Sequence, residues 1–207
     1  MYHSSEFPEL NIPDVNGTYI NSDIGLQVDL PKDSKGKDIS FMDMVIAAPQ
    51  EVDLEATEEP GTVMIIQVIS KEMFNELAGF AQSLGLGGGE NSSQVVSDPL
   101  AVEGDEGEQC KELAASFITI NGIKAEQRSG DCTGEDGSIM KIKGYAFATA
   151  DNTIIMFTLS SNSTNEYNQY LPQFEESDKT IKIEMPGDIA TSELYKRHKK
   201  LETQTTS

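Results

Sequence analysis

The sequence predicts an α+β fold built on an antiparallel β-sheet of about six to seven strands, with helices packed against it. Three observations lead to this prediction. Two pairs of strand-forming runs are each joined by two residues of the kind that closes a tight hairpin turn. Further runs alternate apolar and polar residues, as half-buried strands do, and two other stretches carry apolar residues at helical spacing.

The first expected elements follow a polar N-terminal tail, residues 1–15. Thr18–Ile20 and Ile24–Leu30 alternate as two short strands joined by a polar turn. Pro31 ends the second strand, because proline has no backbone N–H to contribute to a ladder. The chain is therefore predicted to begin its domain with a small hairpin.

Two more strands and a helix are expected next. The polar segment 32–38 is expected to be a loop. Phe41–Ala48 is a strand candidate, and Gly61–Ser70 is apolar enough to be buried on both faces. From Met73 to Leu84 apolar residues recur at helical spacing, which predicts an amphipathic helix that buries one face on the sheet.

Residues 85–109 open with glycines, become strongly acidic and contain neither lysine nor arginine. Such a composition buries too little apolar surface to offset the entropy lost on ordering. This segment is predicted to be a mobile acidic loop between the helix and the next strands.

Two consecutive hairpins are predicted after this loop, and together they make a four-stranded antiparallel meander. Asn121 and Gly122 favour the positive φ angles of a two-residue hairpin turn, and Asp151 and Asn152 tolerate them. The four strands are expected at 116–120, 123–127, 140–150 and 153–160.

Cys110 and Cys132 frame the first of these hairpins. If Ile120 opposes Ile123, opposed residue numbers sum to 243, and the two cysteine numbers sum to 242. The thiols should therefore lie within one position of facing each other, at the Cα separation of roughly 4.4–6.8 Å that a disulfide needs. A cystine would indicate an oxidising compartment.

A second helix is predicted from the capping box of Ser163 and Glu166. Pro172 is expected to kink this helix or end it early, because its ring removes a backbone donor. Residues 180–185 are expected to form a short last strand or an extended strap. From Gly187 a frayed polar tail is favoured over a brief terminal helix, which is suggested by Leu194, Tyr195, His198 and Leu201. The apolar face of the helix consists of Tyr167, Tyr170, Leu171 and Phe174.

The charge of the chain bounds its partners. With 35 acidic and 15 basic residues, the net charge is -20 and the pI about 4.3. Such a chain repels nucleic acid, whose binding needs clustered lysine and arginine. Two interpretations stay open: a solvated surface that keeps the protein soluble, or attraction of cations or a basic partner.

The compartment is predicted from several features. No apolar run approaches the ~20 residues of a membrane span, and the first residues lack the pattern of a signal peptide. The cysteine pair and three acceptor sequons favour an extracytoplasmic location, secreted or at the cell surface. We expect that an export signal or anchor was removed before the numbering begins. The candidate glycosylation sites are Asn16, Asn91 and Asn162.

The sequence predicts no catalytic, cofactor-binding or metal-binding motif. The glycines at 85–89 lack the Gly-Lys-Ser/Thr ending of a phosphate-binding loop. The segment 131–137 is superficially similar to a calcium loop, but it lacks an acid at Thr133 and a bidentate glutamate at Ile142. His3 and His198 have no metal-ligand spacing. We therefore expect a protein without catalysis, without a cofactor and without a defined metal site.

The order of three segments resembles the PsbP-like superfamily. The superfamily includes photosystem II extrinsic proteins, Mog-type Ran-binding proteins, envelope lipoproteins of the DcrB and LpqN kinds, and archaeal surface proteins. The resemblance covers residues 16–186 and implies an antiparallel sheet sandwiched by helices, α/β/α, in a non-enzymatic partner-binding protein. The cysteine pair, acidity and sequons are most similar to its envelope or archaeal surface branch. The segments are NGTYINSDIGLQVDLP, ITINGIKAEQ and DNTIIMFTLSSNSTNEYNQYLPQFEESDKTIKI.

These inferences give one domain at 16–186, flanked by an N-terminal tail, 1–15, and a C-terminal tail, 187–207. The leading hypothesis is a secreted or surface-anchored interaction or envelope-assembly module that binds a protein partner through acidic loops. The alternative is a weak calcium-binding or envelope-stabilising protein that uses the same carboxylates. This candidate surface consists of Glu51, Asp53, Glu55, Glu58, Glu59, Glu103, Asp105, Glu106, Glu108, Asp131, Glu135 and Asp136.

Overall fold

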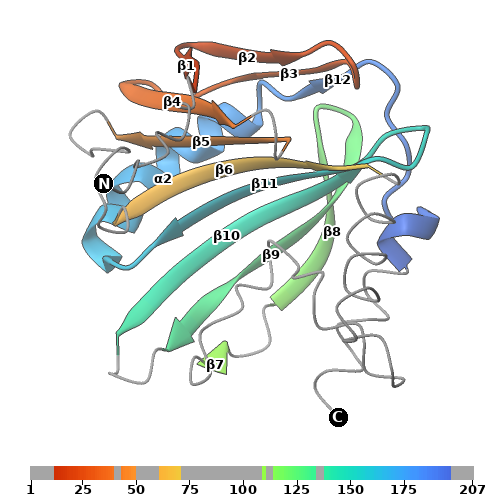
Figure 1. Ribbon diagram of the computed structural model, residues 1–207. Coiled ribbons are helices and arrows are strands. Elements are labelled where there is room, and N and C mark those ends of the chain that lie inside the picture. Colours follow the sequence, from red (N-terminus) through yellow and green to blue (C-terminus); the bar gives the residue numbers. More distant parts are fainter. Residues whose placement is uncertain are drawn as a thin grey trace, which may run out of the picture.

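The computed structural model describes residues 12–39, 43–49, 61–70, 109–110, 114–133 and 138–196 of the chain. These residues form a large antiparallel sheet, a small antiparallel sheet and one long helix, so the predicted α+β class is confirmed (Figure 1). The helix is α2 (Thr164–Asp178). The strands are β1 (Asp14–Val15), β2 (Thr18–Asn21), β3 (Leu26–Asp29), β4 (Ser34–Ile39), β5 (Met44–Pro49), β6 (Thr62–Ile69), β7 (Gln109–Cys110), β8 (Ala114–Ile120), β9 (Ile123–Thr133), β10 (Ile139–Ala148), β11 (Ile154–Ser161) and β12 (Lys182–Ile183).

The large sheet has nine strands in the order β1-β4-β5-β6-β11-β10-β9-β7, and β8 pairs with β9 beside β7. The small sheet has the order β12-β3-β2. The predicted meander is confirmed, because β8, β9, β10 and β11 follow one another by antiparallel pairing. The predicted helix at 73–84 and residues 85–108 of the predicted loop lie outside the described residues.

The large sheet has more strands than the six to seven expected, and β4 is the main reason. Its polar residues fall in the segment 32–38, for which a loop was expected. They pair instead with β5 from Ser34 to Ile39, and β1 pairs with the outer side of β4. Gly36 lets this pairing close, because a Cβ there would lie 3.0 Å from the backbone oxygen of Val15 and from a methyl of Leu30. The loop prediction is wrong here because the pairing of β4 depends on neighbouring strands that are distant in sequence.

The turn between β8 and β9 has the predicted geometry. Asn121 and Gly122 both have positive φ angles, 50° and 79°, and Ile120 pairs with Ile123. The side-chain amide of Asn121 also donates to the carbonyl of Ile181, 3.1 Å away. The turn is therefore attached to the chain that follows α2.

Helix α2 begins as predicted but does not end at Pro172. The hydroxyl of Ser163 accepts a hydrogen bond from the backbone N–H of Glu166 at 3.3 Å, which satisfies one free donor of the first turn. The helix then continues to Asp178. Pro172 is exposed, and so is Asn168, whose carbonyl loses its helical partner. That carbonyl lies on the water-facing side of the helix, where solvent replaces the missing donor.

Segments of the chain pack on both faces of the large sheet. Helix α2 lies across one face, behind β5 and β6 in the view of Figure 1. Phe174 of α2 is completely buried there and stacks on Phe157 and Tyr145, with ring centroids 4.7 and 5.7 Å apart. Of the predicted apolar face of α2, Tyr167 and Phe174 belong to the main core and Leu171 packs against it, whereas half-buried Tyr170 is not part of it.

The segment after Gly187 covers part of the other face. Ile189, Leu194 and Tyr195 are buried and form a second core cluster with side chains of β6, β10 and β11. A frayed tail was expected from Gly187, but residues 187–196 pack on the sheet, with a helical turn at 193–196. Three apolar side chains within seven residues are enough to dock this segment once an apolar sheet face is available.

Candidate functional site

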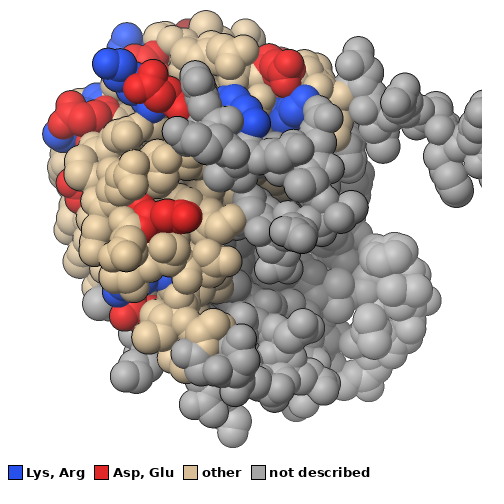
Figure 2. Space-filling view, turned by 90° about the vertical axis from the view of Figure 1, so that its left-hand side faces the viewer, with Lys and Arg blue, Asp and Glu red and all other residues tan. Residues whose placement is uncertain are grey.

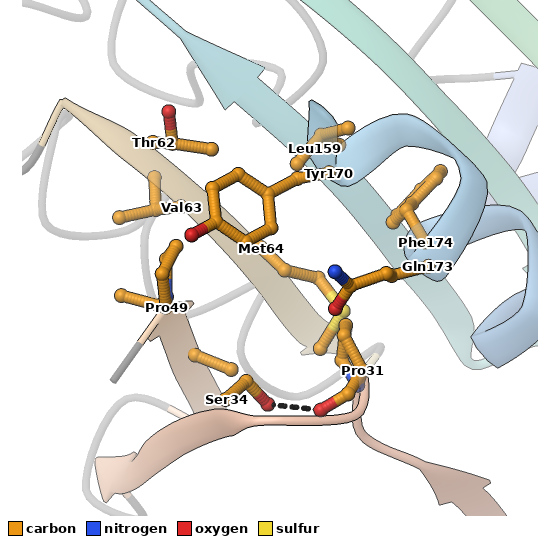
Figure 3. A pocket seen from close by; sticks show the side chains of 12 residues that line it. Pro31, Ser34, Pro49, Thr62, Val63, Met64, Leu159, Tyr170, Gln173 and Phe174 are labelled. Atoms are coloured by element: carbon orange, nitrogen blue, oxygen red, sulfur yellow. Dashed lines mark hydrogen bonds between the residues drawn. The ribbon is translucent and has the colours of Figure 1, made fainter. Parts of the chain in front are cut away.

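An apolar pocket lies beneath α2, between the helix and strands β4, β5, β6 and β11 (Figure 3). It measures about 300 Å³, including space that is open to solvent. None of its lining side chains is an acid, a histidine, a lysine, an arginine or a cysteine. The pocket is lined by Pro31, Ser34, Ala47, Ala48, Pro49, Thr62, Val63, Met64, Leu159, Tyr170, Gln173 and Phe174.

Two polar groups in this pocket have defined surroundings. The hydroxyl of Ser34 donates to the carbonyl of Pro31 at 2.6 Å (Figure 3). The side-chain oxygen Oε1 of Gln173 is buried and accepts no hydrogen bond from the described residues. The pocket therefore offers one acceptor in an apolar wall. The residues that line it do not assemble an acid, a base and a nucleophile.

A second polar group of residues closes the N-terminal end of α2 on the sheet. The hydroxyl of Thr62 donates to Glu166 Oε2 at 2.7 Å and lies 2.7 Å from the hydroxyl of Ser161. The hydroxyl of Ser161 in turn lies 3.0 Å from the carbonyl of Ser163. Each member of this group is satisfied by another member, so the group fixes the helix start and has no free chemistry.

Tyr145 and Asp178 form a buried polar pair where the end of α2 meets β10. Both are nearly inaccessible, at 2% and 6% exposure, and the Tyr145 hydroxyl hydrogen-bonds the Asp178 carboxyl group. Burial raises the pKa of Asp178 above its usual range, while the bond from Tyr145 and the charge of Lys143 act in the opposite direction. Lys143 itself donates to Glu175 Oε1 at 2.5 Å and lies 5.8 Å from the centre of the Tyr145 ring. A perturbed carboxyl group often marks an active site, but this one is enclosed by the core.

Replacement of Asp178 by asparagine should raise the free energy of unfolding at pH 7. The folded-state pKa of Asp178 lies above its unfolded value, so the wild type loses stability as pH rises from the unfolded pKa to the folded one. Asparagine still accepts a hydrogen bond from Tyr145 and carries no charge to bury. The gain should vanish near pH 3, where the wild-type carboxyl group is protonated in both states.

Urea unfolding of wild type and variant at pH 3 and pH 7 measures this difference. Glu176→Gln is the matched control, because Glu176 is exposed on the same helix and its ion pair among the described residues is with exposed Lys179. A lower stability of Asp178→Asn at pH 7 would contradict the prediction, since it would show that the ionised carboxylate is stabilising.

Glu126 and Arg128 form a buried ion pair on β9. Arg128 Nε lies 2.9 Å from Glu126 Oε1, and the two side chains are only 6% and 3% exposed. Being two residues apart on a strand, they point to the same face of the sheet. Their partners across β10 are Gly144 and Ala146, whose small side chains leave room for the two long ones. The sequence does not predict this pair, because its one signal is the i, i+2 spacing of opposite charges, which says nothing about burial.

The cysteine positions meet the prediction more closely than expected. Cys110 of β7 pairs directly with Cys132 of β9, and Cys132 is 1% exposed. Opposed residue numbers sum to 243 along β8 and to 242 along β7, so the register shifts by one between the two strands. This shift brings the cysteines into direct opposition, which supports the disulfide; the bond itself stays a prediction.

Of the predicted acidic surface, the structure describes only Asp131, on β9. Its carboxylate accepts two hydrogen bonds from Lys141 Nζ, at 3.0 and 3.2 Å, and its side chain is half exposed. The other eleven acids lie outside the described residues, so the predicted surface is not tested. On the side shown in Figure 2, described acidic and basic side chains are interspersed, with uncharged surface between them. The described ranges contain no group of three His, Cys, Asp or Glu side chains that could hold a metal ion.

Two of the three predicted glycosylation sites are described, and both are exposed. Asn16 precedes Gly17, which has a positive φ angle of 73°, and Asn162 precedes the N-cap of α2. Asn91 lies outside the described residues. The exposure of Asn16 and Asn162 is compatible with modification, which stays a prediction.

No protein-family model and no curated protein sequence matches the chain. Among solved structures, the chain is similar to the cyanobacterial PsbP protein CyanoP of Synechocystis sp. PCC 6803, at 14% identity and a TM-score of 0.46, covering 82% of this chain and 94% of the other. It is also similar to LpqN of Mycobacterium tuberculosis, described as involved in cell envelope biogenesis, at 11% identity and a TM-score of 0.44, with 83% and 91% covered. A third match, the protein of unknown function PA94 from Pseudomonas aeruginosa, a putative regulator by its description, has 12% identity and a TM-score of 0.38, with 79% and 93% covered.

The first two matches are proteins of the kinds that the sequence resemblance named. At TM-scores below 0.5 they carry no inference about the partner, location or activity of this chain. Within the described residues, no helix combines the length and apolarity needed to cross a membrane.

Proposed function

We propose that this protein is a non-catalytic, extracytoplasmic interaction module, secreted or anchored at a cell surface. The observation that carries the proposal is strand β8, whose residues Ala115, Phe117 and Thr119 are exposed on one face. Phe117, at the centre of β8, is 61% exposed, and none of the seven residues of the strand is charged. Single exposed apolar side chains are common, but an uncharged sheet edge invites pairing, and proteins usually suppress it with charge, proline or short length. A strand that retains this property is suited to a partner that covers it.

The charge of the chain supports the same proposal. At a net charge of -20, the protein attracts cationic partners over long range and repels anionic ones. The acidic segments 51–59 and 98–108 keep their proposed role as the source of this attraction. The partner-binding role implied by the PsbP-like resemblance of the sequence agrees with it.

The extracytoplasmic part of the proposal predicts a cystine between Cys110 and Cys132. Protein from the native source, unfolded without reductant, should show no free thiol, and reduction should release two. Because the bond closes a loop of roughly 20 residues, its reduction should lower the free energy of unfolding by about 3 kcal/mol. Thiol titration and urea unfolding with and without reductant measure both effects, and two thiols before reduction would contradict the proposed compartment.

The interaction itself is tested with the full chain immobilised against the extracytoplasmic fraction of its source. A captured protein is then purified and titrated against the free chain by calorimetry. We expect a saturable complex with fixed stoichiometry. If no purified candidate binds saturably, the proposed function fails.

A further inference from the structure

We infer that the free edge of β8 takes up an extended, cationic segment of a partner protein by strand addition, with Phe117 at the centre of the contact. This inference rests on the proposed function and specifies its partner and its binding mode. Strand addition uses backbone hydrogen bonds for affinity and alternate side chains for selectivity.

Among the described strands, β8 lies at an edge of the large sheet and presents a regular row of backbone groups that pair with no second described strand. Every residue from Ala114 to Ile120 pairs with β9 without interruption, and among the described residues β8 has no other strand partner. In a hairpin closed by a two-residue turn, Ile120 and Ile123 exchange hydrogen bonds, and the direction alternates from there. The N–H and C=O groups of Ala115, Phe117 and Thr119 therefore point away from β9. These three residues, at alternate positions along β8, are available to pair with an incoming strand.

The other sheet edges in the described part of the chain are less suited to this role. At the opposite end of the large sheet, β1 has two residues. In the small sheet, the edges β12 and β2 have two and four residues. β8 has seven residues and contains neither a charged residue nor a proline. It thus lacks the usual features that protect an edge from pairing.

The side chains of β8 define what an added strand would contact. Ala115, Phe117 and Thr119 share one face and are all exposed, while Ser116 is exposed on the other face. Phe117 is the largest of them, so the strongest cross-strand contact would be with an apolar or aromatic side chain placed opposite or diagonal to it. The partner segment is therefore expected to carry an apolar residue at its centre.

Charge selects a cationic segment over a second copy of this chain. A second copy would bring two chains of net charge -20 together. A segment rich in lysine and arginine would be attracted instead, and no charge on β8 itself would have to be desolvated. Self-association through β8 is therefore an outcome of the test rather than the proposal.

The binding experiment uses the full chain and synthetic probes, followed by fluorescence anisotropy at low salt. The probe is a labelled nine-residue peptide in which lysine and valine alternate around a central phenylalanine. Its first control carries glutamate in place of lysine. In the second control peptide, backbone nitrogens on both hydrogen-bonding edges of the extended chain are methylated. This change removes backbone N–H donors and keeps every charge. We expect saturable binding of the probe, no binding of the glutamate control, and a loss of at least about tenfold on methylation, as the loss of two or more hydrogen bonds predicts.

The matching protein variant is the double substitution Ala115→Pro and Thr119→Pro. Both N–H groups point away from β9, so proline removes donors that the fold does not use, and the preceding residues are already extended. We expect a loss of about tenfold in probe affinity with this variant and a several-fold loss with Phe117→Ala. Ile20→Ala is the matched control, since Ile20 is 62% exposed on β2 and should not affect binding.

Three outcomes would overturn the inference. The methylated and unmodified peptides could bind within twofold of each other, which would mean that charge alone attracts them; this arm does not depend on the folding of any variant. A captured partner could bind the double proline variant, verified as folded by circular dichroism, as tightly as the wild type; the proposed function would then survive and the edge would not be its site. Sedimentation velocity could show a dimer that the same variant abolishes, which would assign the edge to a second copy.

Discussion

Replacement of Phe174 by alanine is expected to lower the free energy of unfolding by about 3–5 kcal/mol, the usual range for a fully buried phenylalanine. Phe174 has no exposed surface and stacks between Phe157 and Tyr145. It is also the residue that attaches the middle of α2 to strands β10 and β11. The truncation would leave a cavity beside the existing pocket, and the stacked rings limit how far the surroundings collapse into it.

Chemical unfolding of both proteins, with matched m-values, measures the change. The control is Phe117→Ala, which removes the same atoms from the 61% exposed ring on β8 and should change stability by no more than about 0.5 kcal/mol. The pair separates the effect of burial from the loss of an aromatic ring. Similar losses at the two positions would show that the core does not depend on the α2 contact.

Removing one partner of the buried Glu126–Arg128 pair should cost about 3–5 kcal/mol, because the remaining charge stays buried after it has lost the opposite charge 2.9 Å away. Arg128→Met and Glu126→Met are the two single variants. The double variant should recover a large part of the loss, because two methionines pack against Gly144 and Ala146 without any charge to desolvate. A thermodynamic double-mutant cycle gives the coupling energy between the two residues.

The matched control cycle uses the ion pair of Lys141 and Asp131, whose side chains are 23% and 50% exposed. Solvent screens this pair, so its coupling energy should not exceed about 1 kcal/mol. If the two cycles gave equal coupling energies, the 126–128 pair would be as well solvated as the surface pair. Its burial on the second face of the sheet would then be in doubt.

The candidate sites differ in what they allow. The pocket beneath α2 is apolar and holds one buried acceptor, the side-chain oxygen of Gln173. The Tyr145–Asp178 pair is enclosed by packing. β8 is the feature among these that is both exposed and able to form directional bonds with a macromolecule, which is why the proposed function depends on it.

The sequence alone correctly predicted the elements that depend on local interactions. Asn121-Gly122 closes its hairpin with the expected positive φ angles, and Ser163 caps α2 as expected. The arithmetic of the hairpin placed the cysteines within one residue of their observed pairing. Turn conformation, capping and strand alternation are properties of residues close together in the chain, so a single sequence carries them.

The acidic surface predicted from the sequence shows the limit of that approach. Charge and composition predicted a binding surface of twelve acids, of which the structure describes only Asp131. Its carboxylate accepts a hydrogen bond from Lys141 at the protein surface. The hairpin strand that contains Phe117 was predicted as a strand, but nothing in its seven residues says that it lies at a sheet edge. The identity of an edge depends on all the other strands.

The sequence by itself therefore determined the fold class, the meander, the start of α2 and the positions of the two cysteines. The tertiary structure decided which polar segment became β4, that α2 continues through Pro172, that residues 187–196 pack on the sheet, and that Glu126 and Arg128 are buried. It also decided that β8 is left with a free edge among the described strands. These outcomes depend on contacts between residues far apart in the chain, where burial and pairing override local propensity.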